Sequence, residues 1–153
     1  MQDFYMSPEP GKFARMSKWG VPALSPTVNY GMGLFEGMSI IARKKGSGYR
    51  LSLFHPMLNY ERIKFGVDEL GLNAPAYPME NHIKTIFQIC ALNKWNKKIE
   101  LNGKEISIGR ASGEKYARIY VRPVVYSPTN LIGLGAKMDF TIMHALLPFG
   151  QYL

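Results

Sequence analysis

The sequence predicts an α+β domain, because segments with strand periodicity stand on both sides of a block of two helices. Strand periodicity is clear in YRLSLF, residues 49–54, where apolar and polar residues alternate. Helical periodicity follows, with apolar residues recurring every three or four positions between residues 56 and 93. The length of 153 residues suits one domain.

The first expected strands form a hairpin. We expect residues 32–43 to be one strand, residues 44–48 its turn and residues 49–54 the return strand. The preceding residues 1–28 contain several prolines and are expected to form an extended lead-in.

Two helices follow the hairpin. The first begins near Pro56, where the missing N–H costs no hydrogen bond, and Gly71 is a plausible stop. The second runs from about residue 78 to residue 93. Its apolar face consists of Met79, Ile83, Ile86, Phe87 and Cys90.

The rest of the chain is predicted to be strands. Residues 99–108 contain Asn102-Gly103, the strongest short signal for a hairpin with a type I′ turn. A strand at residues 116–126, a loop at 127–136 and a last strand at 138–149 follow.

Composition excludes few partners by itself. The net charge of +8 is compatible with nucleic-acid binding, but the densest basic clusters, ARKKGSG and NKWNKK, have the composition of turns and element ends. A small phosphorylated ligand would use the charge equally well. No nucleic-acid partner is therefore expected.

Location and metal content are predicted from what the sequence lacks. No apolar run approaches the roughly 18 residues of a membrane helix, and the first residues do not resemble a secretory signal, so we expect a cytoplasmic protein with no membrane partner. The single Cys90 is expected in the core, and one Cys with three His predicts no metal site. His55 and His144 are expected to be structural.

The segment NYGMGLFEGMSI, residues 29–40, is unusual because glycine weakens a strand. As one strand, it would carry Gly31, Gly33, Phe35, Gly37 and Ser39 on a single face. Such a bare face admits a ligand or another backbone, and this segment alone slightly favours a tight contact between elements without a ligand.

A second strand carries cations. In YARIYVRP, Arg118, Tyr120 and Arg122 share one face, and the apolar residues between them belong to the core. Guanidinium groups around a phenol suit a carboxylate or a phosphate, although a solvated sheet face would look the same. Arg62, in LNYERIKF on the first helix, is a third candidate cation.

Four segments together carry a family likeness. NYGMGLFEGM, LFHPMLNYERI, IYVRPV and LPFGQYL, in this order, resemble the small N-terminal domain of the branched-chain aminotransferases, which are fold-type-IV enzymes that use pyridoxal 5′-phosphate. The likeness runs from about residue 17 to the last residue. It implies a mostly antiparallel sheet with two helices on one face, spanning residues 29–149, with residues 150–153 starting the connection to an absent large domain.

The resemblance also implies roles for individual residues. Arg62 matches the arginine that binds the cofactor phosphate, and Arg122 matches the residue that binds the distal carboxylate of glutamate or 2-oxoglutarate. Tyr30 matches a tyrosine that reaches the neighbouring subunit, which implies a homodimer or a higher homo-oligomer. The remaining matched substrate positions are Phe35, Gly37, Tyr120, Leu134, Ala136, Phe149 and Tyr152.

The implied activity is transamination between L-Leu, L-Ile or L-Val and 2-oxoglutarate. The family's Schiff-base lysine lies in the large domain, so we assign no catalytic residue here and expect this chain alone to be inactive. The hairpin at residues 99–108 is longer than expected for the family and is interpreted as a peripheral insertion.

Three alternatives remain open. A D-amino-acid aminotransferase or an aminodeoxychorismate lyase would share the fold, and a stand-alone domain could bind an anion or a partner without catalysis. Nucleic-acid binding is the last alternative and predicts strongly salt-dependent retention on DNA.

Overall fold

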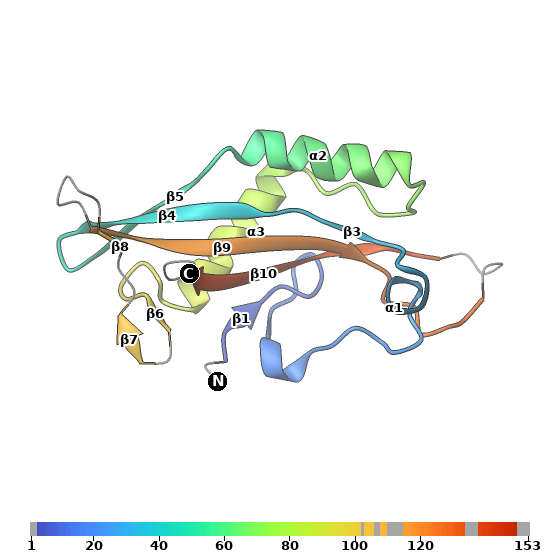
Figure 1. The fold of residues 1–153 in the computed structure, drawn as a ribbon, viewed down its shortest axis with the longest axis horizontal. Coiled ribbons are helices and arrows are strands. Elements are labelled where there is room, and N and C mark those ends of the chain that lie inside the picture. Colours follow the sequence, from blue (N-terminus) through green and yellow to red (C-terminus); the bar gives the residue numbers. More distant parts are fainter. Residues whose placement is uncertain (1–2, 102, 106–107, 110–114, 134–137, 150–153) are drawn as a thin grey trace.

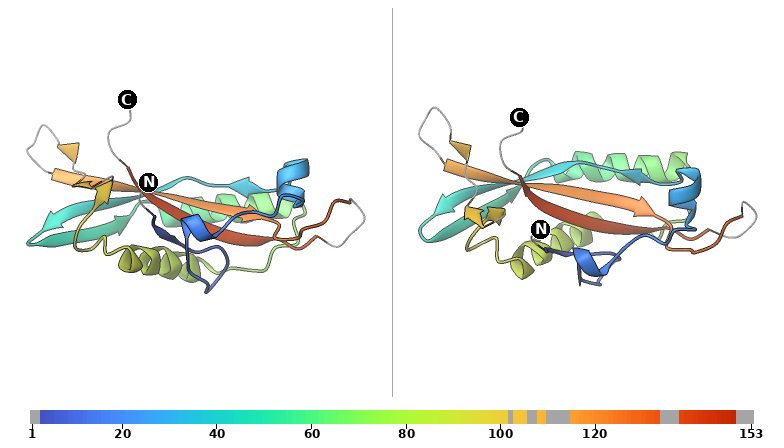
Figure 2. Two further views of the ribbon diagram at one scale, coloured as in Figure 1. Left: turned by 90° about the horizontal axis from the view of Figure 1, so that it is seen from below. Right: turned by 60° about the horizontal axis from the view of Figure 1, so that its bottom comes forward.

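The computed structural model describes residues 3–101, 103–105, 108–109, 115–133 and 138–149. Its architecture is an antiparallel sheet with two long helices, which confirms the predicted fold class (Figure 1). Figure 2 shows α2 running beside β3 at one end of the sheet and α3 crossing a face of the sheet, and residues of both helices belong to the same buried cluster. In the described part of the chain, none of the helices has the length and apolar character that crossing a bilayer requires.

The main sheet is organised around strand β9. Its strands follow the order β10-β9-β4-β5, and the short strands β3 and β8 also pair with β9. All of these pairings are antiparallel. The bounds are β3 Leu34–Phe35, β4 Met38–Lys45, β5 Gly48–Leu53, β8 Ile108–Gly109, β9 Lys115–Tyr126 and β10 Thr141–Phe149.

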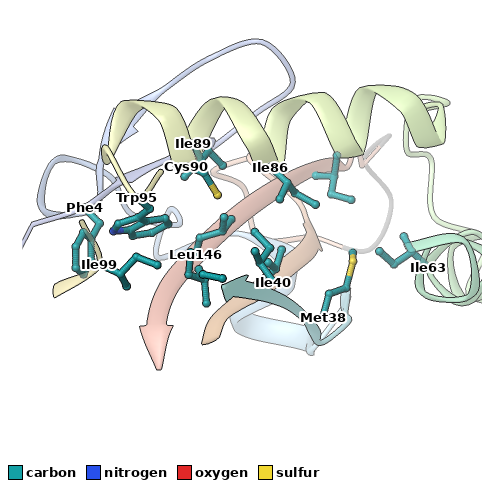
Figure 3. Packing of buried hydrophobic residues seen from close by; sticks show 14 of the residues in the cluster. Phe4, Met38, Ile40, Ile63, Ile86, Ile89, Cys90, Trp95, Ile99 and Leu146 are labelled. Atoms are coloured by element: carbon teal, nitrogen blue, oxygen red, sulfur yellow. The ribbon is translucent and has the colours of Figure 1, made fainter. Parts of the chain in front are cut away.

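The two long helices lie close to their predicted positions. Helix α2 spans Pro56–Glu69, with Pro56 at its first position, and α3 spans Met79–Leu92. Helix α3 turns Ile86, Ile89 and Cys90 toward the sheet, where they are buried (Figure 3). Figure 3 also shows Ile63 of α2 pointing toward Met38 of β4. The two helices thus cover the core face of the sheet.

The N-terminal residues are more structured than the expected lead-in. They contain strands β1 (Tyr5–Met6) and β2 (Ala14–Arg15), a 3₁₀ turn at Met16–Lys18 and helix α1 (Pro26–Tyr30). Phe4 is buried and packs edge-on against Trp95, with ring centroids 5.3 Å apart. This segment therefore contributes to the same hydrophobic core as the sheet.

The glycine-rich segment is not the single strand that we expected. Helix α1 ends at Gly31, whose left-handed backbone (φ 66°) favours glycine, and β3 and β4 are separated by Glu36 and Gly37. We call these two residues the strand gap. The strand gap lies opposite Pro123 of β9, which has no N–H to donate to a partner strand. The N–H of Glu36 bonds across it, to the Pro123 carbonyl at 3.1 Å.

The other predicted hairpins are present with small differences. Lys45 pairs with Gly48, so the first turn is shorter than the expected 44–48. Strands β6 (Glu100–Leu101) and β7 (Lys104–Glu105) pair around Gly103, as expected for the 99–108 hairpin, and Asn102 lies outside the described residues. Strand β10 begins at Thr141 rather than residue 138.

Two histidines form a buried pair between α3 and β10. Nδ1 of His82 lies 2.9 Å from Nε2 of His144, and their side chains are buried. Burial lowers the pKa of His82 to about 4 and that of His144 to about 3. Both imidazoles are therefore neutral at neutral pH.

This pair makes the fold sensitive to acid. An unfolded histidine titrates near pH 6.5, well above both folded pKa values, so the unfolded chain binds more protons between these limits. The free energy of unfolding should therefore fall by a few kcal/mol, in order of magnitude, as the pH drops from about 6.5 toward 4. Urea unfolding at a series of pH values measures it.

The matched variants separate this pair from other titrating groups. His144→Phe removes one buried imidazole and should flatten the pH dependence, whereas the exposed His55→Phe should leave its slope unchanged. An equal dependence of the free energy of unfolding on pH in the unchanged protein and in both variants would contradict the assignment of this effect to the His82–His144 pair.

Candidate functional site

The alternation of strand β9 places cations and aromatics on the face opposite the core. Ala117, Ile119 and Val121 are 0% exposed, while the side chains between them face away from the helices. Three even-numbered residues supply the polar groups of that face: Arg118, Tyr120 and Arg122.

Arg122 lies among aromatic rings. Its guanidinium carbon is 4.2 Å from the ring centroid of Phe35 and 5.0 Å from that of Tyr120. The Tyr120 and Phe149 rings are 5.9 Å apart, and Phe35 is 65% exposed. Cation–π contacts hold the arginine without neutralising it. The cluster is an apolar wall with a positive charge beside it.

Gly37 brings the strand gap close to Tyr120. A Cβ atom at residue 37 would lie 2.9 Å from the Tyr120 hydroxyl oxygen, so only glycine leaves room for this ring. The Gly37 carbonyl accepts a hydrogen bond from Nδ2 of Asn59 at 3.3 Å, and Asn59 is buried on α2. Helix α2 therefore holds the strand gap from one side.

Arg62 reaches the same strand gap. Its Nε donates to Oε2 of Glu36 at 2.5 Å, and Oε1 of Glu36 accepts from the Gly37 N–H at 2.8 Å. Hydrogen bonding to Arg62 lowers the pKa of Glu36, and the same bond raises the pKa of Arg62. Both groups are charged at neutral pH. No partner among the described residues occupies the terminal guanidinium nitrogens of Arg62.

These contacts connect the predicted residues. Glu36 lies between Phe35 and Gly37 in the chain, so its ion pair puts Arg62 beside the segment that borders Tyr120 and Arg122. We call the connected set the arginine–aromatic site. Its members are Phe35, Glu36, Gly37, Asn59, Arg62, Tyr120, Arg122 and Phe149.

Other predicted residues are less closely connected. Tyr30 is the last residue of helix α1 and is 40% exposed. The turn at Gly31 separates it from the strand that contains Phe35. Leu134, Ala136 and Tyr152 lie outside the described residues. Sequence reasoning missed Glu36 and Asn59. Asn59 could have been found, because it stands three residues before Arg62 and so shares its helix face.

Chemically, the arginine–aromatic site can bind an anion beside an apolar group. The two terminal nitrogens of Arg62 can donate to a phosphate or carboxylate, since Nε is already used by Glu36. Arg118 is less available, because its Nη2 donates to the Ser39 hydroxyl at 2.8 Å. The site therefore offers two separate guanidinium groups, Arg62 beside Glu36 and Arg122 beside Phe35.

The comparisons with known proteins agree on one family of enzymes. No family model matches the chain. Branched-chain-amino-acid aminotransferase 3, chloroplastic, of Arabidopsis thaliana is 27% identical over 148 residues, which cover 93% of this chain and 31% of that protein. The chain thus spans about a third of the length of that curated relative.

Solved structures give the same result. A branched-chain aminotransferase from Thermoproteus uzoniensis, crystallised with norvaline, has a TM-score of 0.72 and 25% identity, covering 99% of this chain and 43% of that one. The T.th. branched-chain amino acid aminotransferase with pyridoxamine 5′-phosphate has a TM-score of 0.68 and 18% identity, covering 100% and 42%.

The fold is accordingly that of the small N-terminal domain of fold-type-IV aminotransferases. Over 93% of its length, the chain is similar to branched-chain-amino-acid aminotransferase 3 of Arabidopsis thaliana, at 27% identity. The family resemblance drawn from the four sequence segments is confirmed.

Two glycines of the segment 29–40, Gly33 and Gly37, should respond differently to replacement by alanine. In Gly33→Ala, the new Cβ would lie 2.7 Å from the Val125 backbone oxygen, which cannot move without shifting β9. We expect a loss of about 1–3 kcal/mol in the free energy of unfolding. In Gly37→Ala, the neighbour is the end of the Tyr120 side chain, so the ring should move at a smaller cost.

Urea unfolding and the ring resonances of Tyr120 measure the two effects. Gly33→Ala should lower the unfolding midpoint more than Gly37→Ala, and only Gly37→Ala should shift the Tyr120 resonances strongly. The reverse pattern would contradict the packing described for this segment.

Proposed function

We propose that this chain acts as the small domain of a pyridoxal-phosphate-dependent branched-chain amino-acid aminotransferase. One observation carries the proposal: the ion pair that ties Arg62 to Glu36, at the strand gap between Phe35 and Gly37. This ion pair supports the proposal because it holds a cation that could bind a phosphate beside the segment that carries Phe35. The reaction would exchange the amino group of L-Leu, L-Ile or L-Val with 2-oxoglutarate.

The residues present are compatible with the cofactor phosphate. Arg62 has two terminal nitrogens available, its side chain is 62% exposed, and its Nε is fixed by a carboxylate. A guanidinium held at one nitrogen loses less freedom when it binds phosphate with the other two. Pyridoxal phosphate, when bound, supplies the electron sink of transamination, and the protein supplies binding and orientation.

The substrate side chain would contact the aromatic wall. Phe35, Tyr120 and Phe149 form an apolar surface for a branched alkyl group, and Gly37 keeps that surface open. Arg122 stacks on Phe35 and would turn toward the distal carboxylate of 2-oxoglutarate or glutamate. A hydrogen bond to such a charged group contributes about 1.5–3 kcal/mol. One pocket could thus accept both substrates.

The proposal assigns no Schiff-base lysine within these 153 residues. That lysine would belong to a large domain, so this chain alone is proposed to be inactive. Tyr30, exposed at the end of α1, would reach a second subunit in a homodimer or higher homo-oligomer. The roles of Leu134, Ala136 and Tyr152 and the cytoplasmic location remain predictions.

Cofactor binding can be tested without activity. Pyridoxamine 5′-phosphate, titrated into this chain and followed by ³¹P NMR, should bind weakly, and Arg62→Ala should weaken binding at least tenfold, because it removes charge-assisted hydrogen bonds of about 1.5–3 kcal/mol. Arg50→Ala removes an equal charge from an exposed position on β5 and should have little effect. Equal losses in both variants would indicate charge attraction alone.

Substrate class distinguishes this function from the alternatives. We would join the chain to the lysine-bearing domain of a related aminotransferase and assay it with 2-oxoglutarate. L-leucine should be a better amino donor than D-alanine. Arg122→Ala should raise the KM for 2-oxoglutarate more than the KM for L-leucine. The isolated chain should be inactive. Activity on D-alanine alone would support a D-amino-acid aminotransferase and reject the proposal.

A further inference from the structure

A cavity of about 210 Å³ lies on the core face of the sheet, opposite the face that carries Tyr120. It is partly open to solvent and is lined by α2, by residues 74–77, by His82 of α3 and by side chains of β9 and β10. Its apolar wall comes from both the helix and the sheet. The residues of this wall that matter below are Ile63, Val67, Val125 and Ile142.

One wall of the cavity is a buried imidazole. His82 is 4% exposed, and its Nδ1 is already engaged with Nε2 of His144 at 2.9 Å. The other ring nitrogen, Nε2, has no hydrogen-bond partner among the described residues, although the ring lines the cavity. Nε2 is thus the polar atom of this ring that remains available to a ligand entering the cavity.

The neighbouring histidine decides which proton His82 carries. Nδ1 of His144 is buried and has no partner among the described residues. A buried N–H without an acceptor is rarer in proteins than a buried acceptor without a donor, so Nδ1 of His144 should carry no proton. The proton of His144 then lies on Nε2, which donates to Nδ1 of His82. The proton of neutral His82 then lies on Nε2. The cavity wall thus presents a hydrogen-bond donor.

Two tyrosines hold this ring in place. The Tyr60 and Tyr77 rings pack edge-on against His82, with centroids 5.3 Å and 4.5 Å away. The Tyr77 hydroxyl is already hydrogen-bonded to Oγ1 of Thr85 at 2.6 Å. Tyr77 is therefore a support for His82. The donor position is rigid before any ligand arrives.

The charged residues of the cavity disfavour a ligand with net charge. Lys64 and Asp68 both line the cavity, stand four residues apart on α2 and are exposed. They carry opposite charges, so their fields largely cancel for a ligand lying between them. The buried groups, apolar side chains and a neutral imidazole, also penalise an ion that must lose its water.

We propose that this cavity binds a small uncharged molecule, made of an aromatic ring or a branched alkyl group with one acceptor oxygen, and that His82 Nε2–H donates to that oxygen. An apolar cavity of about 150 Å³ holds a benzene molecule, so 210 Å³ has room for a substituted ring. The inference rests on the core face alone and does not depend on the proposed transaminase function.

The first measurement is the protonation of the two rings. With ¹⁵N-labelled histidine, long-range ¹H–¹⁵N NMR at pH 7.5 should show both His82 and His144 protonated on Nε2. A proton on Nδ1 of either ring would overturn the proposal, because His82 would then present an acceptor to the cavity.

The second measurement is binding of phenol, with benzene as the probe that has no oxygen. Phenol should shift the His82 Nε2 resonance and bind at least tenfold more tightly than benzene. Val67→Phe fills the cavity and should weaken phenol binding at least tenfold, whereas Val28→Phe, the same change at a 58% exposed valine on α1, should not. Circular dichroism checks that both variants fold.

Each remaining outcome is decisive. Absence of phenol binding at millimolar concentration, or equal binding in Val67→Phe and Val28→Phe, would overturn the proposal. Tighter binding of L-valine or of isobutyrate than of phenol would also overturn it, because a zwitterion or an anion would then be the preferred class.

Discussion

The alternation of side chains along β9 is the constraint on which both faces of this protein depend. The strand bonds to β10, β4, β3 and β8, so its backbone cannot rotate to exchange faces. Its odd-numbered residues Ala117, Ile119 and Val121 are buried against the helices. The cations and Tyr120 must therefore face the other way, and a slip of one residue would exchange the core with the arginine–aromatic site.

Helix α2 connects the two regions of interest. Asn59 and Arg62, three residues apart, hold the strand gap through the Gly37 carbonyl and the Glu36 carboxylate. Tyr60 and Val67 line the cavity on the core face. A helix that contacts both regions cannot shift at one without straining the other.

Much of the fold was predictable, because it is specified by short-range patterns. The 3.6-residue period located α2 and α3, and the two-residue period located β5 and β9 within a few residues. Helix α1 was missed although Ser25, Pro26 and Gly31 are ordinary cap signals, because a helix of five residues shows no periodicity. The break between β3 and β4 was not predictable, since it depends on pairing with a distant proline.

By itself, the sequence determined part of the arginine–aromatic site: which residues share the polar face of β9, that glycines gather in residues 29–40, and that Arg62 lies on a helix. Only the tertiary structure decided that Glu36 fixes Arg62, that Gly37 admits Tyr120, and that His82 meets His144 beside a cavity. These contacts join residues up to 83 positions apart, as between Gly37 and Tyr120. Folding brings residues that are far apart in the chain into contact, and no local periodicity in the sequence encodes such contacts.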